Sequence, residues 1–191
     1  MAQKKLILSE KLIVIGGSAG SLEVLLHIMP AIKKINYALV IVLHRKVTND
    51  DILRELLATK TGLRVKEIEE KEIPQQGTIY LVPGDYHVLF EKDHSFSLDY
   101  SEKVNYSRPS IDVVFQSAAE SYANKLACIL LSGANADGTE GLRHVKKYGG
   151  TTIAQTPSSS NVAYMPEQAI AQNVVDHIMD EEAILNFINS F

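Results

Sequence analysis

The 191-residue sequence is poor in features that mark several classes of protein: it has one cysteine, no tryptophan and no block of Lys and Arg. Cys128 cannot form an internal disulfide, and its place in an apolar run indicates a buried, reduced thiol. The net charge of −4 argues against nucleic acid as a partner. No apolar run is long enough to insert into a membrane, and the start of the chain is too polar for a signal peptide. We therefore expect a cytoplasmic protein.

The sequence also lacks the spacing of a metal site or of a dinucleotide-binding loop. It contains no His-x-x-x-His pair and no cysteine cluster, so no metal is expected. The glycines near the start do not fit Gly-x-Gly-x-x-Gly, because Ser18 and Ser21 occupy the second and third glycine positions.

What the sequence does contain is an alternation of short apolar runs with helical patterns. This alternation is typical of βαβ units and predicts an α/β fold with a doubly wound, mostly parallel sheet. The predicted strands are 12–15, 38–43, 127–131 and 151–154. The predicted helices are one ended or kinked by Pro30, and 52–59, 111–123, 139–148 and 181–188.

The middle of the chain has a different pattern. Segments 77–82, 88–91 and 96–99 alternate in character and are separated by turn residues, so we expect a small antiparallel hairpin excursion there. With no internal repeat and no linker, residues 1–191 are expected to form one domain.

Gly16-Gly17-Ser18-Ala19-Gly20 follows the first predicted strand and opens a helical pattern. Gly-x-Ser-x-Gly in that context is typical of a nucleophilic serine, because the glycines permit a sharp, strained turn that exposes the hydroxyl. The same residues could instead cap the helix or cradle an anion. The motif alone leaves these alternatives open.

Two other polar residues follow predicted strands: His44 comes after 38–43, and Asp137 lies in the loop after 127–131. Because the carboxyl ends of parallel strands meet at one edge of a sheet, we expect Ser18, His44 and Asp137 to meet there. Together they have the composition of a Ser-His-Asp triad. Singly, His44 could be an ordinary strand-end histidine, and Asp137 could cap its own helix.

Two further residues are ambiguous from the sequence. His177 is a rival base that would give the chain order of the α/β-hydrolases, but a nucleophile after the first strand disfavours that arrangement. Arg108 precedes a helix for which Ser110 is the expected cap. Arg108 could bind a carboxylate of a ligand or pair with a surface acid.

Several motifs in one order resemble the catalytic domain of the chemotaxis receptor methylesterases, the CheB-type family. The resemblance runs from about Ile13 to Ile170. In chain order, the motifs are Gly16 to Gly20, Leu43-His44, Tyr80 to His87, Ser107 to Phe115, Leu131 to Gly138 and Val162 to Pro166.

This resemblance implies a cofactor-free hydrolase that removes methyl esters from glutamate γ-carboxyls of chemoreceptor cytoplasmic domains and can also deamidate glutamines there. It also implies the same doubly wound fold. Carried over by position, Ser18 is the nucleophile, His44 the base and Asp137 the residue that orients it. The backbone N–H groups of Ala19 and Ala134 are the expected oxyanion donors, and Arg108 and Met165 are candidates for substrate contact.

Two segments depart from the family pattern. Ala134-Asn135 stands where members often have Met or Thr followed by Gly, and Thr156-Pro157-Ser158 stands where acidic residues are usual. No phosphoacceptor receiver domain is expected within these residues, which leaves a regulatory receiver domain to lie elsewhere. The alternatives are a non-catalytic receptor-docking module on the same scaffold and a small-molecule carboxylesterase.

Overall fold

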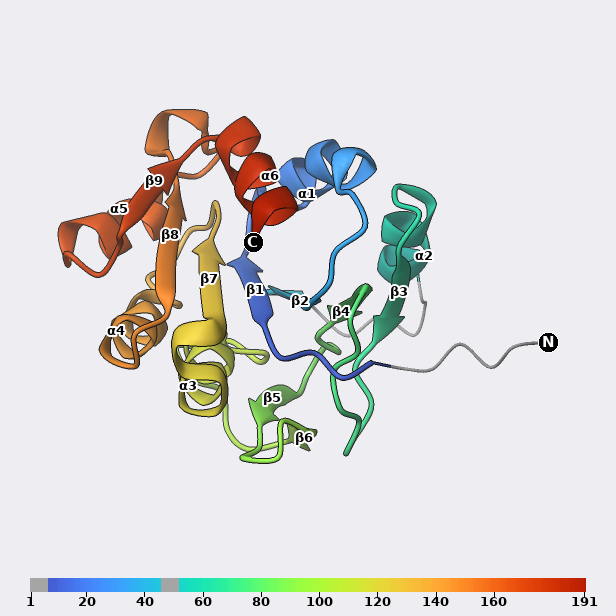
Figure 1. The fold of residues 1–191 in the computed structure, drawn as a ribbon. Helices are drawn as coiled ribbons and strands as arrows, with labels where there is room; N and C mark the ends of the chain where they lie inside the picture. The colour runs from blue at the N-terminus through green and yellow to red at the C-terminus, as the bar shows by residue number, and fades with distance from the viewer. Residues whose placement is uncertain (1–6, 46–51) are drawn as a thin grey trace.

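The computed structural model of the chain describes residues 7–45 and 52–191, and a seven-stranded sheet forms its centre (Figure 1). The strand order is β3-β4-β2-β1-β7-β8-β9, and all neighbouring pairs are parallel. The strands are β1 (Leu12–Gly17), β2 (Ala38–Leu43), β3 (Arg64–Glu67), β4 (Thr78–Leu81), β7 (Leu126–Leu130), β8 (Thr151–Gln155) and β9 (His177–Met179).

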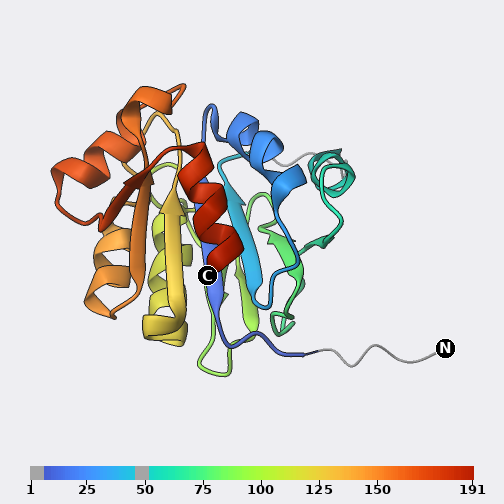
Figure 2. The same cartoon turned by 45° about the horizontal axis from the view of Figure 1, so that its top comes forward.

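Helices cover both faces of the sheet, and the central strands are therefore apolar along their whole length. In β1, Leu12 and Val14 join the core cluster on one face, whereas Ile13 and Ile15 join the cluster on the other. Figures 1 and 2 show α1 and α6 on one face and α3 and α4 on the opposite face. The helices are α1 (Ser21–Ile28), α2 (Ile52–Thr59), α3 (Ile111–Tyr122), α4 (Thr139–Lys147), α5 (Tyr164–Ala171) and α6 (Glu181–Ser190).

The doubly wound sheet and the hairpin are confirmed, but the prediction for one segment is wrong. Strands β5 (His87–Phe90) and β6 (Phe96–Asp99) form a separate antiparallel pair. Segment 77–82 does not join them: β4 is fully buried and lies in the main sheet, parallel to β2 and β3. Its neighbours in sequence are turns, and nothing in so short a run indicates which strand it pairs with.

Strands β3 and β9 and helix α5 were not predicted from the sequence. Both strands lie at edges of the sheet and carry half-exposed or exposed side chains, so neither forms an apolar run. Cys128 lies in β7 and is fully buried, as predicted. No helix in the described part of the chain combines the length and apolar content that a bilayer crossing requires.

The strand order reverses between β1 and β7. From β1 the chain continues to β2 on one side, and it later returns through β7 to build the other side. In parallel α/β sheets, ligands bind in the crevice at such a reversal, beyond the carboxyl ends of the strands. The loops that follow β1 and β7 lie at this edge, together with His44 at the end of β2.

Candidate active site

Backbone hydrogen bonds join the ends of the three central strands. The Ser18 N–H donates to Ser132 O at 2.9 Å, just beyond β7. On the other side, the His44 N–H donates to Gly17 O at 3.1 Å. Ser18 therefore lies between His44, the first residue after β2, and the loop that follows β7.

The turn after Ser18 depends on Gly20. Its φ is +84°, and a Cβ there would lie 2.6 Å from Asn161 Cβ and 2.9 Å from Ser132 Oγ. Among the described residues, those with a positive φ include Gly20 but not Ser18, so the left-handed conformation falls two residues after the serine. Gly20 is also the N-cap of α1, and within the described chain no side chain caps that helix. Ser18 is therefore not a helix cap.

Gly133 brings the loop after β7 against Ser18. A Cβ on Gly133 would lie 3.0 Å from Ser18 Cβ and 2.5 Å from Met165 Cε. The Met165 N–H donates to Gly133 O at 3.0 Å, and the Met165 side chain is fully buried. This burial argues against direct contact between Met165 and a substrate. Met165 packs behind the loop instead.

Ser132 and Gln155 hold the same loop from inside, and sequence reasoning missed both. The buried Gln155 accepts a hydrogen bond from the Ser132 N–H at 3.0 Å through Oε1. Ser132 Oγ donates to Ala19 O at 2.7 Å. The backbone of Ala19 is thereby tied to the loop that carries Ala134, and both alanines are exposed. Buried polar residues at strand ends are the signal that could have found this anchor.

The two departures from the family pattern also have a structural place. Asn135 Oδ1 accepts the backbone N–H of Asp137 at 3.2 Å, so this residue shapes the loop just before α4. The Thr156 segment leads into a short 3-10 helix, Pro157–Ser159. Gln155 Nε2 donates to Ser159 O at 3.0 Å, which joins this segment to the anchor at Ser132.

His44 and Asp137 form a hydrogen-bonded pair. His44 Nε2 lies 2.7 Å from Asp137 Oδ2, and the exposed fractions of the two side chains are 12% and 0%. Because Asp137 occupies Nε2, Nδ1 is the ring nitrogen left for a second partner. Within residues 7–45 and 52–191, Ser18 Oγ makes no hydrogen bond to this ring.

Asp137 also accepts hydrogen bonds from the start of α3. The backbone N–H groups of Ile111 and Asp112 donate to it at 2.7 and 3.0 Å, and Ser110 Oγ donates at 2.9 Å. Burial by itself raises the pKa of Asp137, but the hydrogen bonds from His44 and from these amides outweigh burial and lower it. The group is therefore a carboxylate at neutral pH, stabilised at a helix N-terminus.

Asp112 makes the reciprocal contact. Its Oδ1 accepts the backbone N–H groups of Gly138 and Gly141 at 2.9 and 2.7 Å, at the start of α4. Asp137 thus stabilises α3, and Asp112 stabilises α4. The N-cap residue of α4 is Gly138, and the first turn of this helix donates to the side chain of Asp112, so Asp137 does not cap its own helix. Burial and the charge of Asp137 raise the pKa of Asp112 to about 7.

Asn105 lies against both carboxyl groups. Its Nδ2 is 2.9 Å from Asp112 Oδ2 and 3.5 Å from Asp137 Oδ1. Sequence reasoning found neither Asn105 nor the role of Asp112. An aspartate in the first turn of a predicted helix is commonly explained by the helix dipole alone, and Asn105 lies in a stretch without a motif.

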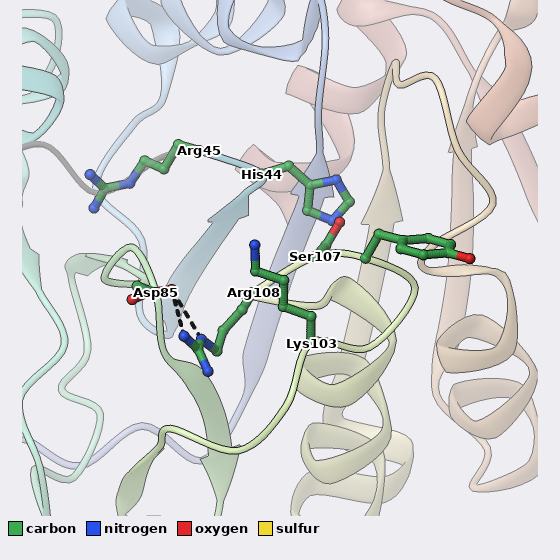
Figure 3. A pocket seen from close by; sticks show the side chains of 7 residues that line it. His44, Arg45, Asp85, Lys103, Ser107 and Arg108 are labelled. Atoms are coloured by element: carbon green, nitrogen blue, oxygen red, sulfur yellow. Dashed lines mark hydrogen bonds and ion pairs between the residues drawn. The ribbon is translucent and has the colours of Figure 1, made fainter.

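A hollow of about 440 Å³ opens beside His44 (Figure 3). Ser18 is not among the described residues that line this hollow, so the hollow lies beside the strand end that carries Ser18. The residues lining it are His44, Arg45, Asp85, Lys103, Tyr106, Ser107 and Arg108.

The guanidinium of Arg108 forms hydrogen bonds to other groups of the protein. Nε and Nη2 donate to Asp85 Oδ1 at 3.1 and 2.8 Å, and Nη1 donates to Ser101 O at 2.6 Å. The group also stacks 3.9 Å above the ring of Tyr100. The hydrogen bond from Arg108 lowers the pKa of Asp85. Of the two alternatives for Arg108, the structure shows the pairing with an acid of the chain.

His177 lies elsewhere. It begins the edge strand β9, is exposed, and pairs with Ile153 of β8. Asp137 is already paired with His44. The arrangement brings Ser18, His44 and Asp137 to one edge and leaves the rival base outside it.

Comparison with known proteins gives one consistent result. A family model described as CheB methylesterase matches residues 13–188. A Leptospira interrogans protein, provisionally named a protein-glutamate methylesterase/protein-glutamine glutaminase, is 40% identical over 173 residues, which are 90% of each chain. A Thermotoga maritima protein-glutamate methylesterase/protein-glutamine glutaminase is 35% identical over 176 residues, which are 90% of this chain and 51% of that protein.

The fold agrees with these similarities. The crystal structure of the Thermotoga maritima CheB methylesterase catalytic domain superposes with a TM-score of 0.89 at 33% identity. The superposition covers 94% of this chain and 97% of that domain. This chain therefore corresponds to about half of the full-length Thermotoga relative and to nearly all of its catalytic domain.

Proposed function

This chain belongs to the CheB methylesterase family, and we propose that it hydrolyses glutamate γ-methyl esters of chemoreceptor cytoplasmic domains through Ser18, His44 and Asp137. The enzyme class is carboxylic ester hydrolase. The observation that supports the mechanism is the hydrogen bond from His44 to the buried Asp137, at the strand end next to Ser18. We assign residues 1–191 to a single catalytic domain.

Acylation begins at Ser18. Its Oγ attacks the carbonyl carbon of the ester while Nδ1 of His44 takes the proton. Asp137 holds the proton on Nε2, which fixes the tautomer, and it stabilises the imidazolium that forms. His44 then gives its proton to the departing methoxide, so that methanol leaves and an acyl-serine remains.

The tetrahedral intermediate carries a negative charge on the former carbonyl oxygen. The backbone N–H groups of Ala19 and Ala134 are the proposed donors to this oxygen. Ala19 is tied through Ser132 to the loop that carries Ala134, and that loop contacts Ser18 at Gly133. Donors held in this way need no rearrangement as the charge develops.

Deacylation repeats the chemistry with water. His44 removes a proton from water, the hydroxide attacks the acyl-serine, and Ser18 leaves with the proton from His44. The product is a free glutamate side chain. A glutamine would follow the same path with ammonia as the first leaving group, and the names of the relatives include this glutaminase activity.

Methanol release from a methylated chemoreceptor cytoplasmic fragment tests the proposal. Wild type should release methanol, whereas Ser18→Ala, His44→Ala and Asp137→Asn, each shown to be folded, should lose release by roughly a thousandfold or more. His177→Ala is the matched control and should retain release.

A wild-type protein that binds the fragment without releasing methanol would contradict the proposal and indicate a docking module. Equal rates on the fragment and on small free esters would instead indicate a small-molecule carboxylesterase, because a protein esterase uses remote contacts with its substrate.

A further inference from the structure

A tight turn lies directly against the buried carboxyl groups. Val104 and Ser107 exchange two backbone hydrogen bonds of 3.2 and 2.9 Å, and Asn105 and Tyr106 occupy the centre of the turn. Their φ values are +51° and +63°, the positive signs of a type I′ turn. Asparagine tolerates this conformation, but a bulky aromatic residue rarely adopts it. The turn therefore holds Tyr106 in an unfavourable backbone state.

The two central side chains have opposite surroundings. Asn105 donates to Asp112 and approaches Asp137, so its side chain is fixed on the inner side of the turn. Tyr106 is 99% exposed. A large aromatic ring held almost wholly in water next to an active site is characteristic of a binding contact, because such rings gain most from burial by a partner.

Tyr106 also lies between two hollows. It lines the hollow of about 440 Å³ that contains His44, and it lines a second one of about 430 Å³ that contains Asp137 and Asp112. A polypeptide that extends from one hollow to the other has to pass this ring. A small ester that reaches only Ser18 and His44 does not.

The positively charged side chains that line the first hollow also favour a polypeptide substrate. Figure 3 shows the Lys103 side chain reaching into it, toward the side where His44 and Arg45 lie. Lys103 comes from the segment that leads into the turn, so one short stretch supplies both an ammonium group and an exposed ring. This combination suits a folded polypeptide with acidic side chains better than a small neutral ester.

We propose that Tyr106 is a specificity-determining residue that contacts the substrate polypeptide beside the ester group. The assignment rests on the proposed function, since it presumes a protein ester as substrate. Asn105 serves as the anchor that holds the turn, and therefore the ring, at a fixed distance from the carboxyl pair. The left-handed backbone at Tyr106 is then a feature of substrate recognition.

The test compares two substrates in the same protein. We would measure kcat/KM for methanol release from a methylated receptor fragment and for hydrolysis of p-nitrophenyl acetate, and take the ratio of the two. Tyr106→Asn removes the ring but keeps a residue that tolerates a positive φ, so the turn is preserved. The control is Tyr148→Asn, a half-exposed tyrosine at the far end of α4.

The ratio should fall about tenfold or more in Tyr106→Asn and stay unchanged in Tyr148→Asn. Tyr106→Phe should retain the wild-type ratio within about twofold, since it keeps the ring. Equal losses on both substrates, or no loss on either, would overturn the assignment. A wild type that hydrolyses p-nitrophenyl acetate but not the fragment would overturn the proposed function first, and this outcome is visible without any variant.

Discussion

Two neighbouring parts of the site are held in opposite ways. Asp137 is wholly buried and accepts hydrogen bonds from His44, from Ser110 and from the backbone of α3. Beside it in space, the turn at Asn105 and Tyr106 leaves a tyrosine ring almost fully in water. The carboxylate proposed to orient His44 is thus held by hydrogen bonds to its side chain, whereas the ring proposed for recognition is positioned only by its turn, which the Asn105 side chain anchors.

This difference follows from what each part has to do. A carboxylate that orients a histidine must not move or change its charge during the reaction, and saturation with N–H donors at a helix N-terminus secures both. A residue that recognises another polypeptide must be desolvated by that partner, so it is exposed beforehand. The predictions below separate the two parts.

The largest effect is expected at the buried carboxylate. Asp137→Asn keeps the shape of the side chain but no longer stabilises the imidazolium or fixes the tautomer of His44. We expect kcat to fall by roughly 10³–10⁴ on both protein and small esters. The control is Asp176→Asn, since Asp176 also accepts hydrogen bonds from Thr152 but lies outside the site. A loss confined to the protein substrate would contradict the division between the two parts.

A smaller effect is expected from the loop that contacts the nucleophile. In Gly133→Ala the new Cβ would lie 2.5 Å from Met165 Cε and 3.0 Å from Ser18 Cβ. A shift of the serine by a fraction of an ångström should lower kcat by roughly a hundredfold. Gly62→Ala is the matched control, because the Cβ added there has no atom of another described residue, apart from its chain neighbours, within 4 Å. Unchanged turnover in Gly133→Ala would show that this contact does not position Ser18.

The smallest effect concerns stability. Burial raises the pKa of Asp112 from its ordinary 3.8 to about 7, so between these values the folded protein holds a proton that the unfolded chain has released. The contribution of Asp112 to the unfolding free energy therefore falls as pH rises from about 4 to 7.

Asp112→Asn removes this titration. The unfolding free energy of the variant minus that of wild type should therefore rise by roughly 1–3 kcal/mol from pH 5 to pH 8. Urea unfolding at the two pH values measures the difference. Parallel pH dependence of the two proteins would contradict the burial of an ionisable pair at this point and would weaken the contrast with the exposed turn.

The sequence was informative where a single strand or helix determined the outcome. The apolar run at 38–43 and the amphipathic pattern at 52–59 coincide with β2 and α2. The meeting of Ser18, His44 and Asp137 at one edge followed from the parallel topology alone. Their roles in catalysis remain proposals.

What the sequence could not show depends on contacts between distant segments. Strand β4 pairs with β2 inside the main sheet, and its four residues contain no signal for that partner over another strand. The exchange between Asp112 and Asp137 requires two helix N-termini to face each other. The exposure of Tyr106 depends on the conformation of its turn, which Asn105-Tyr106 does not signal as Asn-Gly would.

The central claim is that Ser18 is the nucleophile activated by His44 and Asp137, and labelling with a fluorophosphonate tests it most directly. Mass spectrometry of the digested protein should find one label per chain, on the peptide that contains Ser18, with none in Ser18→Ala and a much slower rate in Asp137→Asn. A label on another residue of wild type, or equal labelling rates in wild type and Asp137→Asn, would contradict the account.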